Sequence, residues 1–372
     1  MKRIIAIFLI VTLLWIPTSC IKEGPPAETA PPPPVEAPLV WSDSDAIAEQ
    51  FLMQSGIVDC SKREYSYEEM VADLNELSAA YPSLLSYRAF GESVLGRELY
   101  VAVLGNPNAT RQILVSAGIH GREYLTPLLA MKQIEFYLTY SQNGLYGDLG
   151  YSALFNDTCF YIVPMTNPDG IMMAQAGVTT ITNITLRQEL QSIYHKDFEG
   201  GYTKQTQIDE YLKIWKANAN GVDLNRNFDA LWDEYNGIRR KSHKNFKGTE
   251  PNSEPETQAM IALTESLPNI QAVISLHSQG EVLYWNCGQE DELAQKTLDF
   301  TQMLSAQTGY EVKTQQNNDA SYTDWCALQK GLIAVTVETG TDTCPLPISQ
   351  FPTIWMQNYD LLAASAAYFQ AN

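Results

Sequence analysis

Basic side chains and histidines are both scarce in this sequence. It holds 24 Lys and Arg against 43 Asp and Glu, for a formal net charge of −19. Proteins that bind nucleic acid or anionic lipid surfaces by charge need clustered Lys and Arg, so this balance argues against both kinds of binding. Nothing in the sequence indicates a partner protein. With only four histidines in the chain, any histidine at the end of an apolar run is a candidate for chemistry.

Several metal-binding and crosslinking patterns are also missing. No two of the six cysteines have Cys-x-x-Cys spacing, which argues against a structural zinc site on cysteines, and the chain has no His-Glu-x-x-His motif. Without Cys20, five cysteines remain, so a monomer keeps at least one free thiol. We expect mostly buried free thiols, with at most one disulfide among Cys60, Cys159, Cys287, Cys326 and Cys344.

The N-terminal segment reads as a processing signal. Lys2 and Arg3 precede an apolar stretch over residues 4–16 that is too short for a comfortable membrane span. Ser19-Cys20 resembles the end of a bacterial lipobox, which predicts a signal peptide over 1–20 and lipidation of Cys20. The alternative is an ordinary secreted protein cut nearby. In both cases the mature protein lies outside the cytoplasm, and as a lipoprotein it is anchored to the cell membrane.

Two further segments precede the main domain. Residues 21–40 are rich in Pro, Ala and Glu, which favours an extended tether that cannot pack a core. Residues 41–64 form a polar lead-in, with a short helix expected over 45–54. The main folded domain is then predicted over 65–372.

Strand and helix patterns alternate through that domain. A capping box at Ser66 and Glu69 begins the first helix, and a hairpin follows over 84–104. This alternation predicts a single doubly wound α/β sheet, mixed because of the hairpin, with helices on both faces. Strands are expected at 113–117, 160–163, 272–276 and 333–337, and helices at 125–138, 254–267, 291–308, 324–329 and 354–368.

A long polar excursion, residues 169–213, has weak periodicity. We expect it to cross the sheet as a partly helical loop. His195 and His243 lie in polar sequence and are expected to be exposed.

Three short apolar runs end in residues that suit metal binding or proton transfer: His120, with Glu123 three residues later, His277 and Glu338. Open α/β sheets place their ligands outside the carboxyl ends of the strands. Two His and one Glu match the ligand set of a catalytic zinc that keeps its fourth position for water. Glu338 remains as a base, which favours a hydrolase.

Several ordered motifs make the sequence resemble the metallocarboxypeptidase A family over residues 65–369, with a carboxypeptidase A-like fold. They are Ala117-Gly118-Ile119-His120-Gly121-Arg122-Glu123, Thr166-Asn167-Pro168-Asp169-Gly170, Gly221-Val222-Asp223-Leu224-Asn225-Arg226-Asn227-Phe228, Ser275-Leu276-His277-Ser278, Thr323-Asp324-Trp325 and Thr336-Val337-Glu338-Thr339-Gly340.

The resemblance implies one Zn²⁺ per chain on His120, Glu123 and His277. It also implies that Glu338 is the general base. The Asn225-Arg226 pair would grip the substrate's terminal carboxylate, since the planar fork of arginine meets a carboxylate bidentately. Arg122 matches a second arginine of that subsite.

Two positions depart from the family pattern. Lys216 stands where animal digestive members carry an arginine that stabilises the oxyanion, and it is predicted to serve as a point charge instead. The mobile tyrosine of many members aligns with Gln316, and Tyr322 is the nearby substitute. Thr323, at a position that influences side-chain choice in the family, does not decide the specificity.

The segments Trp215-Lys216-Ala217-Asn218 and Cys344-Pro345-Leu346-Pro347 resemble the bacterial branch of the family, which includes γ-D-glutamyl-diamino acid peptidases of cell-wall peptides. This branch is ranked first because an extracytoplasmic location agrees with it. The alternatives are a general carboxypeptidase that releases C-terminal residues, a zinc acyl-amino-acid deacylase, and an inactive peptide-binding lipoprotein. The intact zinc set and Glu338 argue against the last.

Overall fold

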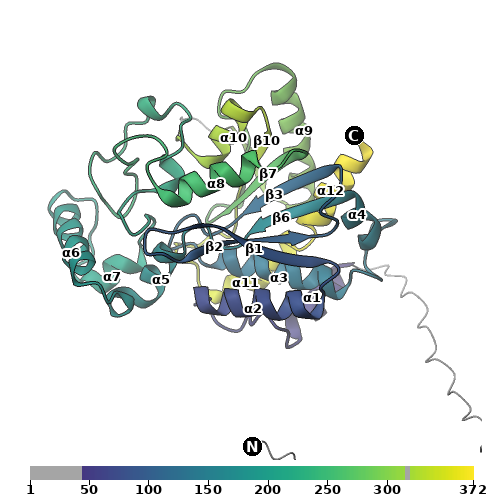
Figure 1. Cartoon of the computed structure of the whole chain (residues 1–372), viewed down its shortest axis with the longest axis horizontal. Helices are drawn as coiled ribbons and strands as arrows, with labels where there is room; N and C mark the ends of the chain where they lie inside the picture. Colours follow the sequence, from purple (N-terminus) through teal and green to yellow (C-terminus); the bar gives the residue numbers. More distant parts are fainter. Residues whose placement is uncertain (1–43, 315–318) are drawn as a thin grey trace, which may run out of the picture. The chain divides into compact units, whose positions relative to one another are not determined.

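The computed structural model describes residues 44–314 and 319–372 (Figure 1). The predicted signal peptide, Cys20 and the Pro-rich linker lie outside the described residues. Among the helices that are described, none combines the length and the apolar character that a membrane span requires.

A mixed eight-stranded sheet forms the centre of the domain (Figure 1). Four central strands run parallel, and the hairpin β1–β2 joins one side of them antiparallel, as the sequence predicts. On the other side β8 pairs antiparallel with β10 and carries β9 at the edge. The strand order is β1 (Leu85–Glu92), β2 (Glu98–Leu104), β6 (Thr158–Val163), β3 (Arg111–Ser116), β7 (Ile270–His277), β10 (Ile333–Glu338), β8 (Val282–Tyr284), β9 (Glu311–Lys313).

Helices cover both faces of this sheet, which confirms the predicted fold class. Successive strand residues point to opposite faces: Ile113 and Val115 of β3 join the larger core, whereas Leu114 joins the smaller one. The larger core is covered by α2 (Tyr67–Ala80), α3 (Leu125–Thr139), α4 (Tyr151–Asp157), α9 (Asp291–Thr308), α11 (Phe351–Asn358) and α12 (Leu361–Ala371). The smaller core is covered by α8 (Pro255–Glu265) and α10 (Tyr322–Lys330).

Local signals at the helix ends were accurate. Ser66 and Glu69 form the predicted capping box of α2. Helix α9 has the predicted bounds, and Gly309 follows it in the left-handed conformation that glycine adopts easily (φ 76°). In the lead-in, α1 (Ser44–Met53) packs on the domain, where the Trp355 indole donates to the Ala48 carbonyl. All five cysteines of the described residues are free.

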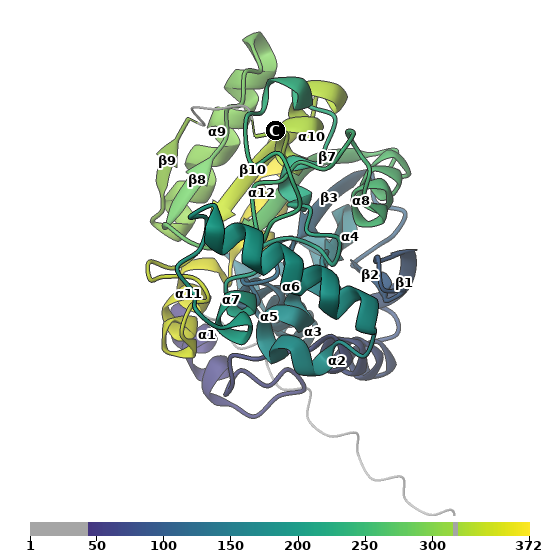
Figure 2. The same ribbon diagram turned by 90° about the vertical axis from the view of Figure 1, so that its left-hand side faces the viewer.

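The excursion over 169–213 is far more helical than expected. It contains α5 (Pro168–Ala176), α6 (Ile184–Glu199) and α7 (Ile208–Lys213), with α6 lying across the molecule in Figure 2. Buried Asp197 ties α6 to the following loop, because it accepts hydrogen bonds from Tyr211, Ser242 and His243. Polar contacts with residues distant in the sequence thus help to hold α6 in place. The apolar periodicity within the segment is weak, and it did not reveal the helices.

The single C-terminal helix predicted over 354–368 is wrong, because the chain breaks it at Tyr359 and Asp360 into α11 and α12. The hydroxyl of Tyr137 donates to the Tyr359 carbonyl (2.7 Å) and accepts from the Ala363 amide (3.1 Å). It therefore replaces a direct helical hydrogen bond, and an inserted side chain of this kind bends a helix.

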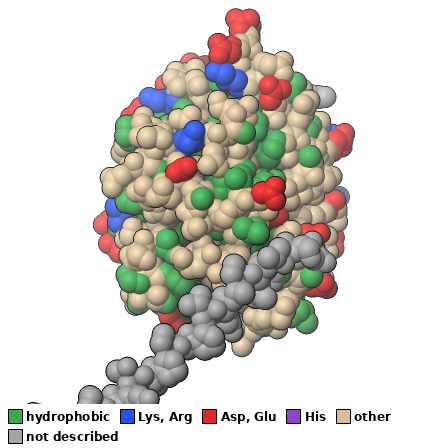
Figure 3. Space-filling model, turned by 90° about the vertical axis from the view of Figure 1, so that its right-hand side faces the viewer, with side chains coloured by type: hydrophobic (Ala, Val, Ile, Leu, Met, Phe, Trp, Pro, Cys, Tyr) green, Lys and Arg blue, Asp and Glu red, His purple; other side chains and the backbone are tan. Residues whose placement is uncertain are grey.

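Charged side chains on the face drawn in Figure 3 are scattered singly, with both signs present. The strong negative charge of the chain is thus not gathered into one patch on that face.

Candidate active site

The ends of three adjacent parallel strands bring the predicted reactive residues together. His277 ends β7 and Glu338 ends β10, and the two face each other in the strand register. His120 and Glu123 lie in the loop between β3 and α3, and β3 pairs with β7 on its other side. The carboxyl ends of parallel strands meet at one sheet edge, which is where open α/β sheets bind ligands.

A glycine makes this loop possible. A Cβ on Gly121 would lie 2.5 Å from the Gly170 carbonyl oxygen and 2.8 Å from that of Trp215. The Gly121 amide also donates to the Lys216 carbonyl (3.1 Å). The close approach of three chain segments therefore fixes His120 and Glu123 on either side of Gly121.

His120, Glu123 and His277 form a compact, buried donor set whose candidate ligand atoms all lie within 4.8 Å of one another. The Nδ1 atoms of His120 and His277 lie 2.9 Å and 3.1 Å from the two oxygens of Glu123. Although burial opposes it, the two imidazoles hold the pKa of the Glu123 carboxyl well below its usual range. Two imidazole nitrogens and a carboxylate that converge in this way suit a Zn²⁺ ion.

Asp223 orients the donor set through a contact with His120. It was not identified as a functional residue from the sequence. Its Oδ1 atom lies 3.1 Å from Nε2 of His120, so the other ring nitrogen is turned toward Glu123. Metal-binding histidines commonly have such a carboxylate partner, which fixes the ring orientation. The available signal was its place just before Asn225-Arg226, beside a predicted substrate site.

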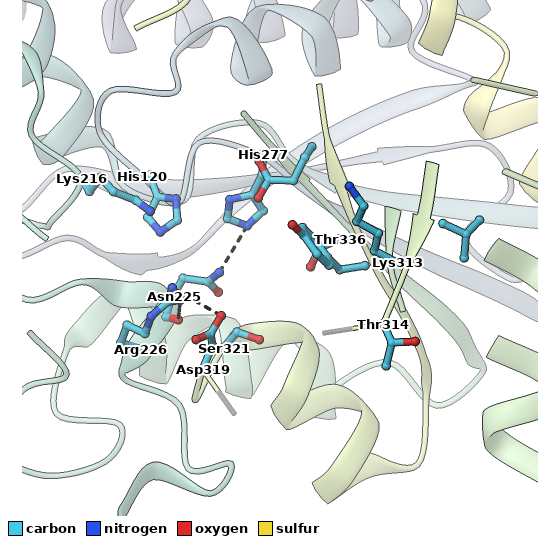
Figure 4. A pocket seen from close by; sticks show the side chains of 13 residues that line it. His120, Lys216, Asn225, Arg226, His277, Lys313, Thr314, Asp319, Ser321 and Thr336 are labelled. Atoms are coloured by element: carbon cyan, nitrogen blue, oxygen red, sulfur yellow. Dashed lines mark hydrogen bonds and ion pairs between the residues drawn. The ribbon is translucent and has the colours of Figure 1, made fainter. Parts of the chain in front are cut away.

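A cavity of about 780 Å³ opens beside the histidines (Figure 4). It contains most of the predicted site residues, since Lys216, Asn225, Arg226 and Glu338 all line it. Its further lining residues are Tyr284, Val312, Lys313, Thr314, Asp319, Ser321 and Thr336.

Arg226 lies at one wall of the cavity with 15% of its side chain exposed. Its Nη1 atom donates to the Asn225 carbonyl (2.7 Å), and Nη2 lies 3.5 Å from Asp319. Its buried Nε atom has no hydrogen-bond partner. Since the Asp319 contact is long, the guanidinium retains donors for an incoming anion.

Glu338 is half-buried at the end of β10, where it is the register partner of His277. Burial, opposed by the charge of His277, raises the pKa of the Glu338 carboxyl to about 7. A carboxyl group of this pKa exchanges protons readily near neutral pH.

The structure places three side chains differently from the expectations: Tyr322, His243 and Arg122. Tyr322 is fully buried in the smaller core, its hydroxyl is 2.6 Å from that of Thr264, and it does not reach the cavity. Gln316 lies outside the described residues. His243 is buried rather than exposed, because Asp197 binds its Nδ1 atom, whereas His195 is exposed as predicted. Arg122 does not line the cavity with Arg226.

The family profile described as zinc carboxypeptidase matches residues 70–361. The chain belongs to this family. It is 32% identical over 309 residues to γ-D-glutamyl-L-diamino acid endopeptidase 1 of Lysinibacillus sphaericus, covering 82% of this chain and 72% of that protein. It is 26% identical over 239 residues to human mast cell carboxypeptidase A, covering 61% of this chain and 48% of that one.

Solved structures agree on the fold. Thrombin-activatable fibrinolysis inhibitor aligns with a TM-score of 0.62 at 19% identity, over 86% of this chain and 81% of that one. Carboxypeptidase A from Helicoverpa armigera aligns with a TM-score of 0.61 at 18% identity, over 88% and 81%.

This zinc carboxypeptidase-family protein is therefore a zinc metallopeptidase, with His120, Glu123 and His277 as the residues that hold the ion. When bound, Zn²⁺ supplies Lewis acidity, which lowers the pKa of water from 15.7 to about 7 and polarises the scissile carbonyl.

Proposed function

We propose that this metallopeptidase cleaves the γ-D-glutamyl bond to a diamino acid in bacterial cell-wall peptides. The relative from Lysinibacillus sphaericus, which is named for that activity, supports the proposal. The polarity of the cavity supports it independently.

The composition of the cavity wall is the observation that carries this proposal. Asp319 and Lys313 place both charge signs in it, and Ser321 and Thr336 add hydroxyls. The Thr336 hydroxyl lies 3.0 Å from that of buried Thr323, and Lys313 pairs with Glu311. A diaminopimelate side chain ends in an ammonium and a carboxylate, which can add hydrogen bonds to the polar groups of the cavity wall. An apolar side chain would displace water from these groups without offering a hydrogen bond, which costs free energy.

The roles of the lining residues follow from their positions. Arg226 and Asn225 bind the carboxylate of the leaving residue. Glu338 takes a proton from the attacking water and passes it to the departing amine. Lys216 stabilises negative charge on the scissile carbonyl oxygen as a point charge.

We also propose that the protein works outside the cytoplasm on a lipid anchor at Cys20, which would place it beside its substrate. The sequence of residues 1–20 supports this proposal. Cell fractionation tests it: the wild type is expected with the membranes, and a Cys20→Ala variant is expected in another fraction. Equal distribution of the two would contradict the anchor.

The activity is tested by giving the zinc-loaded protein two peptides in one assay. One is L-Ala-γ-D-Glu-meso-diaminopimelate, and the other is an all-L peptide with an apolar C-terminus. Mass spectrometry identifies the released amino acid, and a chelator-treated sample is the control.

Release of diaminopimelate alone is the expected result. Cleavage of the all-L peptide alone would identify a general carboxypeptidase and overturn the proposal. If neither peptide is cut while zinc is bound, acyl-amino acids become the substrates to test.

A further inference from the structure

Three cationic side chains from distant parts of the sequence lie side by side next to the zinc ligands. Lys216 occupies the middle: its carbonyl accepts from the Gly121 amide (3.1 Å), and its amide donates to the His243 carbonyl (2.8 Å). Arg122 and Lys244 directly follow those two partners. Backbone hydrogen bonds thus hold Arg122, Lys216 and Lys244 together, and we call these residues the cation cluster.

No member of the cation cluster forms an ion pair with another residue in the described part of the chain. The two carboxylates whose charges act on Lys244 have other partners, because Asp197 binds Arg240 and His243 while Asp223 binds His120. The Nε atom of Arg122 is buried without a hydrogen-bond partner. In a chain with a net charge of −19, three unpaired neighbouring cations suggest a site for an anion.

The positive charges in the cation cluster repel one another. Partial burial, together with the positive charges of Arg122 and Lys216, lowers the pKa of the Lys244 ammonium. Like charges close together at partly buried positions raise the electrostatic free energy of the protein, and a bound anion offsets this repulsion. All three side chains are half-buried, so an anion from solvent can still reach them.

Lys216 connects the cation cluster to the cavity. Lys216 lines the cavity beside His120, and Figure 4 shows it at the opposite end from Lys313 and Thr314. Arg122 and Lys244 do not line the cavity. Under the proposed function the leaving residue fills the cavity, so Arg122 and Lys244, which lie outside the cavity next to Lys216, are placed to contact the acyl part of the substrate.

We infer that Arg122 and Lys244, which lie on either side of Lys216, bind the free α-carboxylate of a γ-linked D-glutamyl residue, while Lys216 faces the scissile carbonyl oxygen. This inference rests on the proposed function and adds how the enzyme recognises the γ linkage. A γ-linked glutamate keeps its α-carboxylate, separated from the scissile carbonyl by a short methylene chain. In an ordinary peptide only an α-linked glutamate places a carboxylate at this separation, and its branching carbon is then next to the scissile carbonyl instead of next to the carboxylate. Charge-assisted hydrogen bonds from Arg and Lys suit such a group.

The test compares two substrates that differ only in this carboxylate: L-Ala-γ-D-Glu-meso-diaminopimelate and its α-amide, which contains D-isoglutamine. For the zinc-loaded wild type we expect kcat/KM to be roughly tenfold or more higher for the acid, as loss of a hydrogen bond to a charged group implies. Lys244→Gln should bring the ratio of the two kcat/KM values close to one. Lys244→Arg should retain most of the preference.

Lys213→Gln is the matched control, because it removes a charge from an exposed lysine of α7 that pairs with Glu210. It should keep the wild-type ratio. Melting temperature and zinc content establish that each variant is folded and loaded.

The outcomes separate the two proposals. If the wild type cleaves neither peptide, the proposed function fails and this inference fails with it. If the wild type cleaves both peptides with the same kcat/KM, the carboxylate site alone is overturned. The same conclusion follows if Lys244→Gln retains the wild-type preference for the acid.

Discussion

At the scale of single residues, Glu338 offers the most direct test of the chemistry. Glu338→Gln keeps the shape of the side chain but removes its capacity to accept a proton. We expect kcat to fall by about 10²–10⁴ while bound zinc, measured by elemental analysis, stays unchanged. Glu292→Gln, at an exposed position in α9, is the control. Retained turnover in Glu338→Gln would show that another group acts as the base.

Lys216 is tested through the turnover rate rather than through binding. Lys216→Ala removes the cation nearest His120 on the cavity wall, and kcat should fall by about 10²–10³, the usual cost of losing an oxyanion donor. Zinc content should not change, since Lys216 is not a ligand. Lys216→Arg should recover part of the rate, and an unchanged kcat in Lys216→Ala would remove Lys216 from the mechanism.

Glu256 gives the folded protein a pH-dependent stability. Burial raises the pKa of this carboxyl to about 7 from its ordinary value of 4.5, although Val94 and Asn218 donate hydrogen bonds to it. Between these two pH values the folded state binds more protons than the unfolded state. The free energy of unfolding therefore falls as the pH rises through this window, by up to about 3 kcal/mol from this group.

Denaturant titrations at pH 5 and pH 8 measure that effect. Glu256→Gln cannot titrate, so the difference in unfolding free energy between the two pH values should be smaller in this variant than in the wild type. Asp73 and Asp360, whose pKa values burial raises to about 6, keep their contributions in both proteins. An identical pH dependence would show that Glu256 titrates normally.

At the scale of elements, the break between α11 and α12 depends on one hydroxyl. Tyr137→Phe removes the group that bridges the Tyr359 carbonyl and the Ala363 amide. Because both backbone groups are buried, we expect a loss of about 1–3 kcal/mol in unfolding free energy. Tyr87→Phe on β1 should change stability less, since no hydrogen bond of its hydroxyl occurs within the described residues. Equal effects of the two substitutions would contradict this role.

At the scale of the whole molecule, removal of zinc should lower both the activity and the thermal stability of the protein. A chelator is expected to abolish peptide cleavage and to lower the melting temperature, because the ion binds the folded state and its ligands come from separate parts of the chain. Calorimetry with and without added Zn²⁺ measures the shift. A melting temperature that zinc does not affect would argue against binding at His120, Glu123 and His277.

Local patterns in the sequence identified much of the fold. The capping box at Ser66, the bounds of α9 and the hairpin were predictable because each depends on residues close together in the chain. The reactive residues were also predictable, since each follows a short apolar run and parallel strands end at one edge. The division of the C-terminal helix was not, because its cause is Tyr137, far away in sequence.

The sequence by itself determined the zinc ligands of this protein, and it also indicated the residues proposed here as the base and as the carboxylate-binding arginine, Glu338 and Arg226. Only the tertiary structure decided which side chains share a space. It buried Tyr322 in the core, recruited Asp223 behind His120, and placed Arg122 beside Lys216 and Lys244 instead of beside Arg226. The physical reason is that these placements depend on hydrogen bonds between segments far apart in the chain. No periodicity or spacing within one segment records such contacts.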